Sequence, residues 1–316
     1  ILLIANIMKI SEKEIIDLVS KKINFREEVL VPVGEDAGVI FPKQDSNLVV
    51  TTDTMVLNTH FSADITPYEL GYISAASNIS DLSAMGALPA FATVNLTIEE
   101  PTKYYIDNLI NGYNDLFKEF PVTVLGGDTT YGHTSLTMTL IGYSNSNNFM
   151  KTSDAKSGDK IFISGPVGNS LLAKRNKLYN MPELRNKLGV LLPDYANSCT
   201  DMSDGLLKSI SLITKKSNLG AKIKIDDIVV DNKVRDLLGE GIIGWEDILS
   251  YGEDYELLFT VNENSSLILK KMCESINLNI YEIGFLNDTR KITFHSERKI
   301  INIDTAKKFE HFDNDK

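Results

Sequence analysis

The spacing of apolar and polar residues predicts helices and strands that alternate along most of the chain. Apolar side chains recur on one side of residues 11–22, which is typical of an amphipathic helix, and Ser11 and Glu14 form a capping-box pattern at its start. Helices opened by a proline are expected over residues 67–84 and 101–120. The pattern predicts strands over residues 39–41, 48–52, 90–98, 122–125 and 135–143.

The second half of the chain repeats this alternation after a polar interruption at residues 144–148. It predicts a strand over residues 160–164, a helix opened by residues 165–170, a helix over residues 206–214 that Ser203 or Asp204 could cap, and a strand over residues 255–261. We therefore expect an α/β (α+β) chain of two domains, residues 8–149 and 150–316.

Composition and charge narrow the class of protein. The formal net charge of -11 leaves no basic stripe for a nucleic-acid backbone, and no segment is apolar enough for a membrane helix. Nucleotides stay possible, because Mg²⁺ can supply positive charge. The two cysteines, Cys199 and Cys273, exclude a disulfide scaffold and a cysteine zinc cluster, and they fit a reducing cytoplasm. We expect residues 1–7 to be an extension upstream of a natural start at Met8.

Candidate chemistry lies in six short runs that combine acidic residues with Gly, Ser or Thr. Oxygen ligands of this kind suit hard divalent cations, and Mg²⁺ usually binds through a few carboxylates plus substrate phosphates. The runs therefore predict a shared multi-metal phosphate site. They are Gly34-Glu35-Asp36, Thr51-Thr52-Asp53, Asn78-Ile79-Ser80-Asp81, Gly126-Gly127-Asp128-Thr129-Thr130, Asp201-Met202-Ser203-Asp204-Gly205 and Gly252-Glu253-Asp254-Tyr255.

Runs in the first half also have structural interpretations. Asp128 and Asp53 stand at expected strand ends, and Gly127 allows close backbone approach to a ligand, but each run is equally compatible with a local turn. Asp81 lies among small and apolar residues, where an unpaired carboxylate is costly. Either a metal ion or hydrogen-bond network compensates for it, or Asp81 is a helix N-cap.

Runs in the second half pose the same alternatives. Asp201 and Asp204 flank Ser203 just before a predicted helix, whose N-terminus favours phosphate, and capping would explain only one of the two. Glu253 and Asp254 precede a strand, and a solvated acidic turn is the simpler interpretation. The chain has no Walker-type loop, no dinucleotide fingerprint and no paired-histidine spacing for zinc, so a nucleotide would be held through carboxylate-bound metals.

Taken in order, the six runs resemble the motifs of the thiamine-monophosphate kinase family. This family belongs to an ATP-binding superfamily with aminoimidazole ribonucleotide synthetase and selenophosphate synthetase. The resemblance extends to Phe309-Glu310-His311-Phe312, which is similar to the family's closing aromatic-x-His-Phe. It implies ATP-dependent, in-line phosphorylation of thiamine monophosphate to thiamine diphosphate. It also implies a cytoplasmic homodimer whose N-terminal mixed sheets pair into a barrel, with a C-terminal α/β domain beside each site.

The resemblance implies several bound Mg²⁺ ions and a division of roles. The acceptor is already an anionic phosphate oxygen, so catalysis would be mostly positioning and charge neutralisation, with no strong general base. Catalytic roles fall to Asp81, Asp128 and Asp204. The implied Mg²⁺ ligands are Asp36, Thr52, Asp53, Asp81, Asp128, Asp201 and Asp204.

The resemblance also assigns residues to the two substrates. ATP would meet Ser203, Gly127 and Lys151, the last as a point charge where the family usually carries arginine; Tyr131 likewise replaces a usual arginine. The thiamine phosphate would meet His60, Glu253 and Phe309, with Phe309 stacking on a ring.

Other functions remain open on the sequence. An aminoimidazole ribonucleotide synthetase is the nearest alternative, and a non-catalytic Ca²⁺- or Mg²⁺-binding protein is an alternative from another class. Selenophosphate synthetase fits poorly, because its reactive N-terminal Cys or selenocysteine segment is missing and the first cysteine is Cys199. A hydrogenase-maturation relative would carry a C-terminal cysteine, which this chain lacks.

Overall fold

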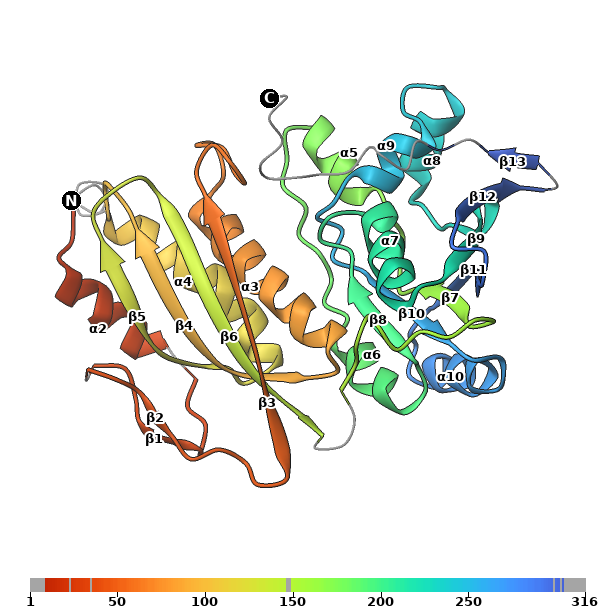
Figure 1. Cartoon of the computed structure of the whole chain (residues 1–316). Coiled ribbons are helices and arrows are strands. Elements are labelled where there is room, and N and C mark those ends of the chain that lie inside the picture. Colours follow the sequence, from red (N-terminus) through yellow and green to blue (C-terminus); the bar gives the residue numbers. More distant parts are fainter. Residues whose placement is uncertain are drawn as a thin grey trace. The chain divides into compact units, whose positions relative to one another are not determined.

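The computed structural model describes residues 9–22, 24–34, 36–145, 149–297, 299–301 and 303. The chain divides into two compact units: Ile1–Leu82 with Ala87–Asn147, and Ser83–Gly86 with Asn148–Lys316. The expected domain boundary, after residue 149, lies two residues beyond this division. Each unit combines a sheet with helices, in agreement with the predicted α/β (α+β) class (Figure 1).

The first unit is built on a four-stranded sheet of order β3-β6-β4-β5. Neighbouring strands are antiparallel except β4 and β5, which run parallel. Strands β1 and β2 form a separate antiparallel pair. The strands are β1 (Val29–Val31), β2 (Val39–Ile40), β3 (Ser46–Val56), β4 (Leu88–Thr97), β5 (Thr123–Thr130) and β6 (Ser135–Asn145), and the helices are α2 (Glu12–Lys22), α3 (Pro67–Ala84) and α4 (Lys103–Glu119).

Helices α3 and α4 cover one face of this sheet (Figure 1). The two helices can approach closely because Gly71 of α3 has no side chain: a Cβ there would lie only 2.1 Å from the carbonyl oxygen of Leu109 in α4. The expected capping box of α2 is confirmed: the Ser11 N–H donates to Glu14 Oε2 at 2.7 Å, and the Glu14 N–H donates to Ser11 Oγ at 3.4 Å. The predicted start of α3 at a proline is confirmed as well.

Three local predictions in this unit are wrong. The strand predicted to end at residue 125 continues to Thr130, because β5 stays paired with β4 as far as Thr97, so Asp128 lies within a strand. Asp53 lies inside β3 and not at its end, because β3 pairs with β6 along its whole length. Asp81 lies inside α3, so it is not a helix N-cap.

The second unit is built on a seven-stranded sheet of order β13-β12-β9-β11-β7-β10-β8, in which β9 and β12 run parallel. Its strands are β7 (Lys160–Ile163), β8 (Ser198–Asp201), β9 (Gly220–Lys224), β10 (Leu257–Val261), β11 (Tyr281–Asn287), β12 (Ile292–Ser296) and β13 (Lys299–Ile301). Its helices are α5 (Asn169–Arg175), α6 (Asn186–Leu191), η1 (Leu192–Asp194), α7 (Leu206–Ser217), η2 (Ile225–Asp227), α8 (Asn232–Gly239), α9 (Trp245–Ser250) and α10 (Glu263–Ser275).

The described residues of this unit form two apolar cores. One gathers residues of α7, α8 and α9, including Ile210, Val234 and Ile248. The other includes Leu188 of α6 and Leu269 of α10. Burial of both faces explains why β10 reads as a continuous apolar run and not as an alternating strand, since all five of its residues are buried.

Candidate functional site

A first cluster of predicted site residues lies between the four-stranded sheet and α3. The Thr51 hydroxyl on β3 donates a hydrogen bond to Asp81 Oδ2 on α3 at 2.5 Å. Burial raises the pKa of Asp81 to about 6, and the negative charge of Asp53 adds to the rise, while the Thr51 hydrogen bond opposes it. We call Thr51, Asp53 and Asp81 the helix-side cluster.

Two other predicted residues, Thr52 and Asp128, lie on the opposite face of the same sheet. Side chains alternate between the faces of a strand, so Thr52 points away from its neighbours Thr51 and Asp53. Its hydroxyl lies 2.8 Å from that of Thr139 on β6. Asp128 lies opposite Asn95 of β4, which lies opposite Thr137 of β6, which in turn lies opposite Thr54 of β3. Asp128 therefore shares the sheet face of Thr54, which is also the face of Thr52. The sheet therefore separates the predicted ligands of this unit into two sets.

Gly127 lies where two backbones come very close. Its φ is +156°, and a Cβ there would lie 1.8 Å from the carbonyl oxygen of Val94 on β4. The glycine is thus required by strand packing, whether or not a ligand also approaches it.

The remaining predicted residues of the first unit are more peripheral. Asp36 is exposed. His60 follows β3, and its Nδ1 accepts a hydrogen bond from the Val56 N–H at 3.1 Å, which holds the ring against the end of that strand. In the second unit, Lys151 is about half exposed; its Nζ lies 4.0 Å from Asp154 and 5.1 Å from the centre of the Phe149 ring. Phe309 lies outside the described residues.

The second unit brings two of the acidic runs together. Strands β8 and β10 pair in antiparallel register, with Asp201 opposite Leu257, so the loop after β8 meets the loop before β10. The Met202 N–H donates to the Glu256 carbonyl oxygen at 2.8 Å, and the Glu253 N–H donates to the Ser203 carbonyl oxygen at 2.8 Å. We call residues 201–205 the β8–α7 loop and residues 252–255 the pre-β10 loop.

The β8–α7 loop presents two carboxylates and a hydroxyl. Asp201 is buried, and the Ser203 hydroxyl donates to its Oδ1 at 3.4 Å. Asp204 forms an ion pair with Lys208 of α7, 2.7 Å apart. The expectation that Ser203 or Asp204 caps α7 is wrong: Gly205 is the N-cap and α7 has no side-chain cap. The side chains of both residues contact other groups instead, Ser203 contacting Asp201 and Asp204 contacting Lys208.

The pre-β10 loop carries Glu253 and Asp254 in different surroundings. The side chain of Glu253 reaches solvent. The surrounding protein atoms partly desolvate its carboxyl group and so raise its pKa, while the positive charge of Lys174 lowers that pKa. Asp254 is 7% exposed, and burial raises its pKa to about 6, although hydrogen bonds from the N–H groups of Gly168 and Ser170 favour its charged form.

Sequence reasoning gave no role to the groups that support this loop. Arg185 makes a bidentate ion pair with buried Glu256: its Nε donates to Oε2 at 2.6 Å and its Nη2 donates to Oε1 at 2.5 Å. The Ser164 hydroxyl donates to the same carboxylate. Glu256 follows directly after its acidic run, which was a usable signal, but Arg185 stands alone in an irregular segment and gave none.

The donor chemistry fits a hard divalent cation. Among the described residues, no three His, Cys, Asp or Glu side chains lie close enough together to hold a metal ion by themselves. Mg²⁺ does not require such a cage, since it typically binds one or two carboxylates and completes its shell with water and substrate phosphate oxygens. The helix-side cluster and the β8–α7 loop each offer carboxylates beside a hydroxyl, which is a donor set of that kind.

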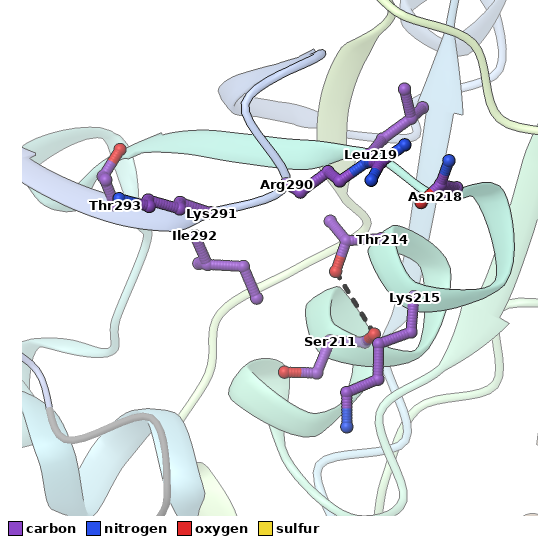
Figure 2. A pocket seen from close by; sticks show the side chains of 9 residues that line it. All are labelled: Ser211, Thr214, Lys215, Asn218, Leu219, Arg290, Lys291, Ile292 and Thr293. Atoms are coloured by element: carbon purple, nitrogen blue, oxygen red, sulfur yellow. Dashed lines mark hydrogen bonds between the residues drawn. The ribbon is translucent and has the colours of Figure 1, made fainter.

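An open depression of about 560 Å³ lies elsewhere in the second unit, beside the C-terminal part of α7 (Figure 2). The residues lining it are Ser211, Thr214, Lys215, Asn218, Leu219, Arg290, Lys291, Ile292 and Thr293. The side chains of Lys215 and Arg290 extend away from each other (Figure 2), so their charges do not converge on one point. Among the predicted site residues that the structure describes, none lines it.

Across the described residues, no helix combines the length and apolar character needed to cross a bilayer.

The sequence of this chain matches known proteins over both units. The family model described as AIR synthase related protein, N-terminal domain, matches residues 34–144, and the corresponding C-terminal domain model matches residues 127–297. The thiamine-monophosphate kinase of Buchnera aphidicola subsp. Acyrthosiphon pisum (strain APS) is 31% identical, over 97% of this chain and 100% of its own length.

Solved structures agree with the sequence matches. A crystal structure of thiamine-monophosphate kinase from Stenotrophomonas maltophilia K279a has a TM-score of 0.81 and 29% identity, over 93% of this chain and 99% of that one. A structure described as AaThiL complexed with AMPPCP and TMP has a TM-score of 0.73, over 96% of this chain and 99% of that one; at 24% identity it shows the shared fold.

Proposed function

We propose a reaction and a site for this chain on the premise that it belongs to the thiamine-monophosphate kinase family, as its sequence matches show. The chain is a phosphotransferase that uses ATP to phosphorylate thiamine monophosphate, and the product is thiamine diphosphate. The observation that carries this conclusion is the 31% identity to the Buchnera kinase over 97% of the chain. The AMPPCP and TMP named for the AaThiL structure support the choice of the two substrates.

The helix-side cluster is proposed to hold a cation in the first unit. The ionised form of Asp81 costs free energy at this position, because burial and the charge of Asp53 both oppose its ionisation. A bound cation would remove that cost, which gives a physical reason for two carboxylates at this position. Thr51 orients Asp81 through its hydrogen bond.

Thr52 and Asp128 are proposed to act on the other face of the sheet. Because they point away from the helix-side cluster, we expect them to hold a different ion. Asp36 is proposed as a further ligand from the segment before β2. Gly127 is proposed to let the nucleotide approach the backbone next to Asp128, and Lys151 to contribute one positive charge to the ATP phosphates.

The β8–α7 loop is proposed to meet the nucleotide in the second unit. Asp201 and Asp204 would be Mg²⁺ ligands, and Ser203 would contact ATP. The contact of this loop with the pre-β10 loop supports a shared role, because it places Glu253, a proposed thiamine phosphate residue, next to the proposed ATP residue Ser203. His60 and Phe309 are the other residues proposed for the thiamine phosphate.

Charge neutralisation is the main chemical task of this site. Donor and acceptor both carry phosphate charge, and when bound Mg²⁺ supplies the neutralising charge on their oxygens. The protein's own residues fix positions: Asp81 is held by Thr51, and Asp204 is held by Lys208. Since the acceptor oxygen is already anionic, we propose direct in-line transfer without a general base.

The exposed face of the first unit's sheet supports the proposal of a homodimer. Leu48, Val50 and Leu88 are 48%, 60% and 47% exposed, although each belongs to a regular strand. Apolar residues gathered on one sheet face are typical of a surface that a second copy covers. Thr52 and Asp128 lie on the same face but toward the other end of β3, away from the row that joins Leu48 and Leu88. We propose that two sheets pair into a barrel at the Leu48 end, and that the dimer works in the cytoplasm, where free, buried Cys199 and Cys273 would stay reduced.

The decisive experiment follows both products in one reaction. The purified chain is incubated with ATP, thiamine monophosphate and Mg²⁺, and thiamine diphosphate and ADP are quantified by chromatography. We expect the two in equal amounts, and no turnover after chelation of divalent ions. ADP without thiamine diphosphate would show that ATP is hydrolysed without transfer to thiamine monophosphate, and would refute the proposed acceptor. Binding of both substrates without product would indicate a non-catalytic binding protein.

A further inference from the structure

Glu253 lies in a loop whose backbone conformation is unusual. The φ angles of Glu253 and Tyr255 are +66° and +53°, in the left-handed region that residues with a Cβ rarely adopt. Gly252 allows the loop to touch its neighbour, since a Cβ there would lie 2.1 Å from the Ser203 carbonyl oxygen. A backbone of this kind persists only where the surrounding contacts impose it.

Asp254 makes those contacts from the centre of the loop. Its Oδ2 accepts a hydrogen bond from the Gly168 N–H at 2.7 Å. Its Oδ1 accepts from the Ser170 N–H at 2.9 Å and from the Ser170 hydroxyl at 2.7 Å. The same hydroxyl lies 2.6 Å from the carbonyl oxygen of Gly252, so Ser170 touches the loop at two points. A buried carboxylate with three donors is fixed in place.

The same hydrogen bonds cap helix α5. Its N-cap residue, Gly168, has a φ of +90° and no side chain with which to satisfy the first N–H groups of the helix. Aspartate is among the residues that perform this task best, and its charge is favourable at the positive end of a helix. Asp254 therefore does from another loop what an N-cap aspartate does within its own helix.

Helix α5 also carries a charge that acts on Glu253. Lys174, in its last turn, has its Nζ 5.3 Å from the centre of the Tyr251 ring. The positive charge of Lys174 lowers the pKa of Glu253 against the larger effect of burial. Glu253 and Lys174 keep this arrangement only while α5 stays joined to the pre-β10 loop.

We propose that Asp254 is a positioning residue: by capping α5 from the pre-β10 loop, it holds Glu253 in the position from which that side chain meets the thiamine phosphate. This rests on the proposed function, which assigns Glu253 to that substrate. Asp254 itself is buried by α5 and the loop, so it acts through Glu253 and not by contact with the substrate.

The test compares Asp254→Asn with the wild-type chain. The amide keeps the volume of the carboxylate but turns an NH₂ group toward at least one N–H donor of α5. We expect the KM for thiamine monophosphate to rise about tenfold or more and the KM for ATP to stay within about twofold, as a misplaced substrate contact predicts. Hydrogen exchange at the Gly168 and Ser170 amides should become faster. Unchanged exchange in the variant would overturn the cap itself.

Four further variants separate positioning from a loss of stability. Asn262→Ala removes the cap of α10, where the Asn262 side chain accepts from the Ser265 N–H at 2.9 Å, and it should leave both KM values unchanged. Ser170→Ala is the milder change if Asp254→Asn does not fold, and it should raise the same KM by a smaller factor. Glu253→Gln combined with Asp254→Asn should be no worse in that KM than Glu253→Gln alone.

These outcomes distinguish the two proposals. If Asp254→Asn speeds exchange and Glu253→Gln raises the KM for thiamine monophosphate, but Asp254→Asn leaves that KM unchanged, the positioning role is refuted and the proposed function stands. If neither variant changes that KM while exchange still becomes faster, the cap stands, and the assignment of Glu253 to this substrate fails together with the positioning role. An equal rise in the KM for ATP would show general disruption and would also refute positioning.

Discussion

Replacing Asp81 with Asn removes one negative charge from the helix-side cluster and keeps an oxygen that can accept the Thr51 hydrogen bond. Burial raises the pKa of Asp81 from 3.8 to about 6 in the folded protein. A shift of about two units corresponds to about 3 kcal/mol of cost for the charged form near neutral pH, at about 1.4 kcal/mol per unit. We therefore expect Asp81→Asn to raise the free energy of unfolding by about 1–3 kcal/mol without divalent ions.

The pH dependence of this gain has a definite sign. Because the folded-state pKa is raised, the folded protein binds more protons than the unfolded chain between pH 3.8 and about 6. The stability of the wild-type chain therefore falls as pH rises through that window, and the advantage of the variant grows. Below pH 3.8, where Asp81 is protonated in both states, the advantage should vanish.

Urea unfolding followed by circular dichroism, at several pH values and with divalent ions chelated, measures the gain directly. Exposed Asp17 provides a matched control, because Asp17→Asn should give no such gain. Added Mg²⁺ should stabilise the wild-type chain more than Asp81→Asn, and the variant should have no kinase turnover. A variant less stable than wild type near neutral pH would refute the electrostatic reasoning, and full turnover would refute the proposed metal role.

Three other changes test separate parts of the structure. Gly127→Ala should destabilise the first unit by about 3 kcal/mol in urea unfolding, because its Cβ would meet a carbonyl oxygen of β4, whereas Gly126→Ala, with nothing within 4 Å of its Cβ, should cost far less. Arg185→Ala should cost about 3–5 kcal/mol by leaving buried Glu256 unpaired, and adding Glu256→Gln should recover part of that loss. Val50→Glu should convert the proposed dimer into a monomer in sedimentation experiments; an unchanged dimer would exclude this face as the interface.

Sequence patterns predicted an element correctly where neighbouring residues alone decide its structure. Residues 67–84 form α3 as expected, because a proline at the first position and a run of small and apolar residues act within the helix itself. The prediction that Asp128 stands beyond a strand end was wrong, because glycines that favour a turn in isolation can also permit close strand pairing. Pairing with β4, far away in the sequence, decided between the two.

Sequence alone thus determined most elements of the first unit, the family and the acidic residues that serve as candidate ligands, since all of these depend on residue type and short spacing. After residue 214 it predicted only the strand that became β10, and it gave no prediction for β9, α8, α10 or β11 to β13. The tertiary structure decided which of these residues meet. Strand register placed Asp53 and Asp128 on opposite faces of one sheet, and the pairing of β8 with β10 joined the loops of Ser203 and Glu253. The contact of Asp254 with Ser170 spans 84 residues of sequence, and no local propensity encodes a contact at that separation.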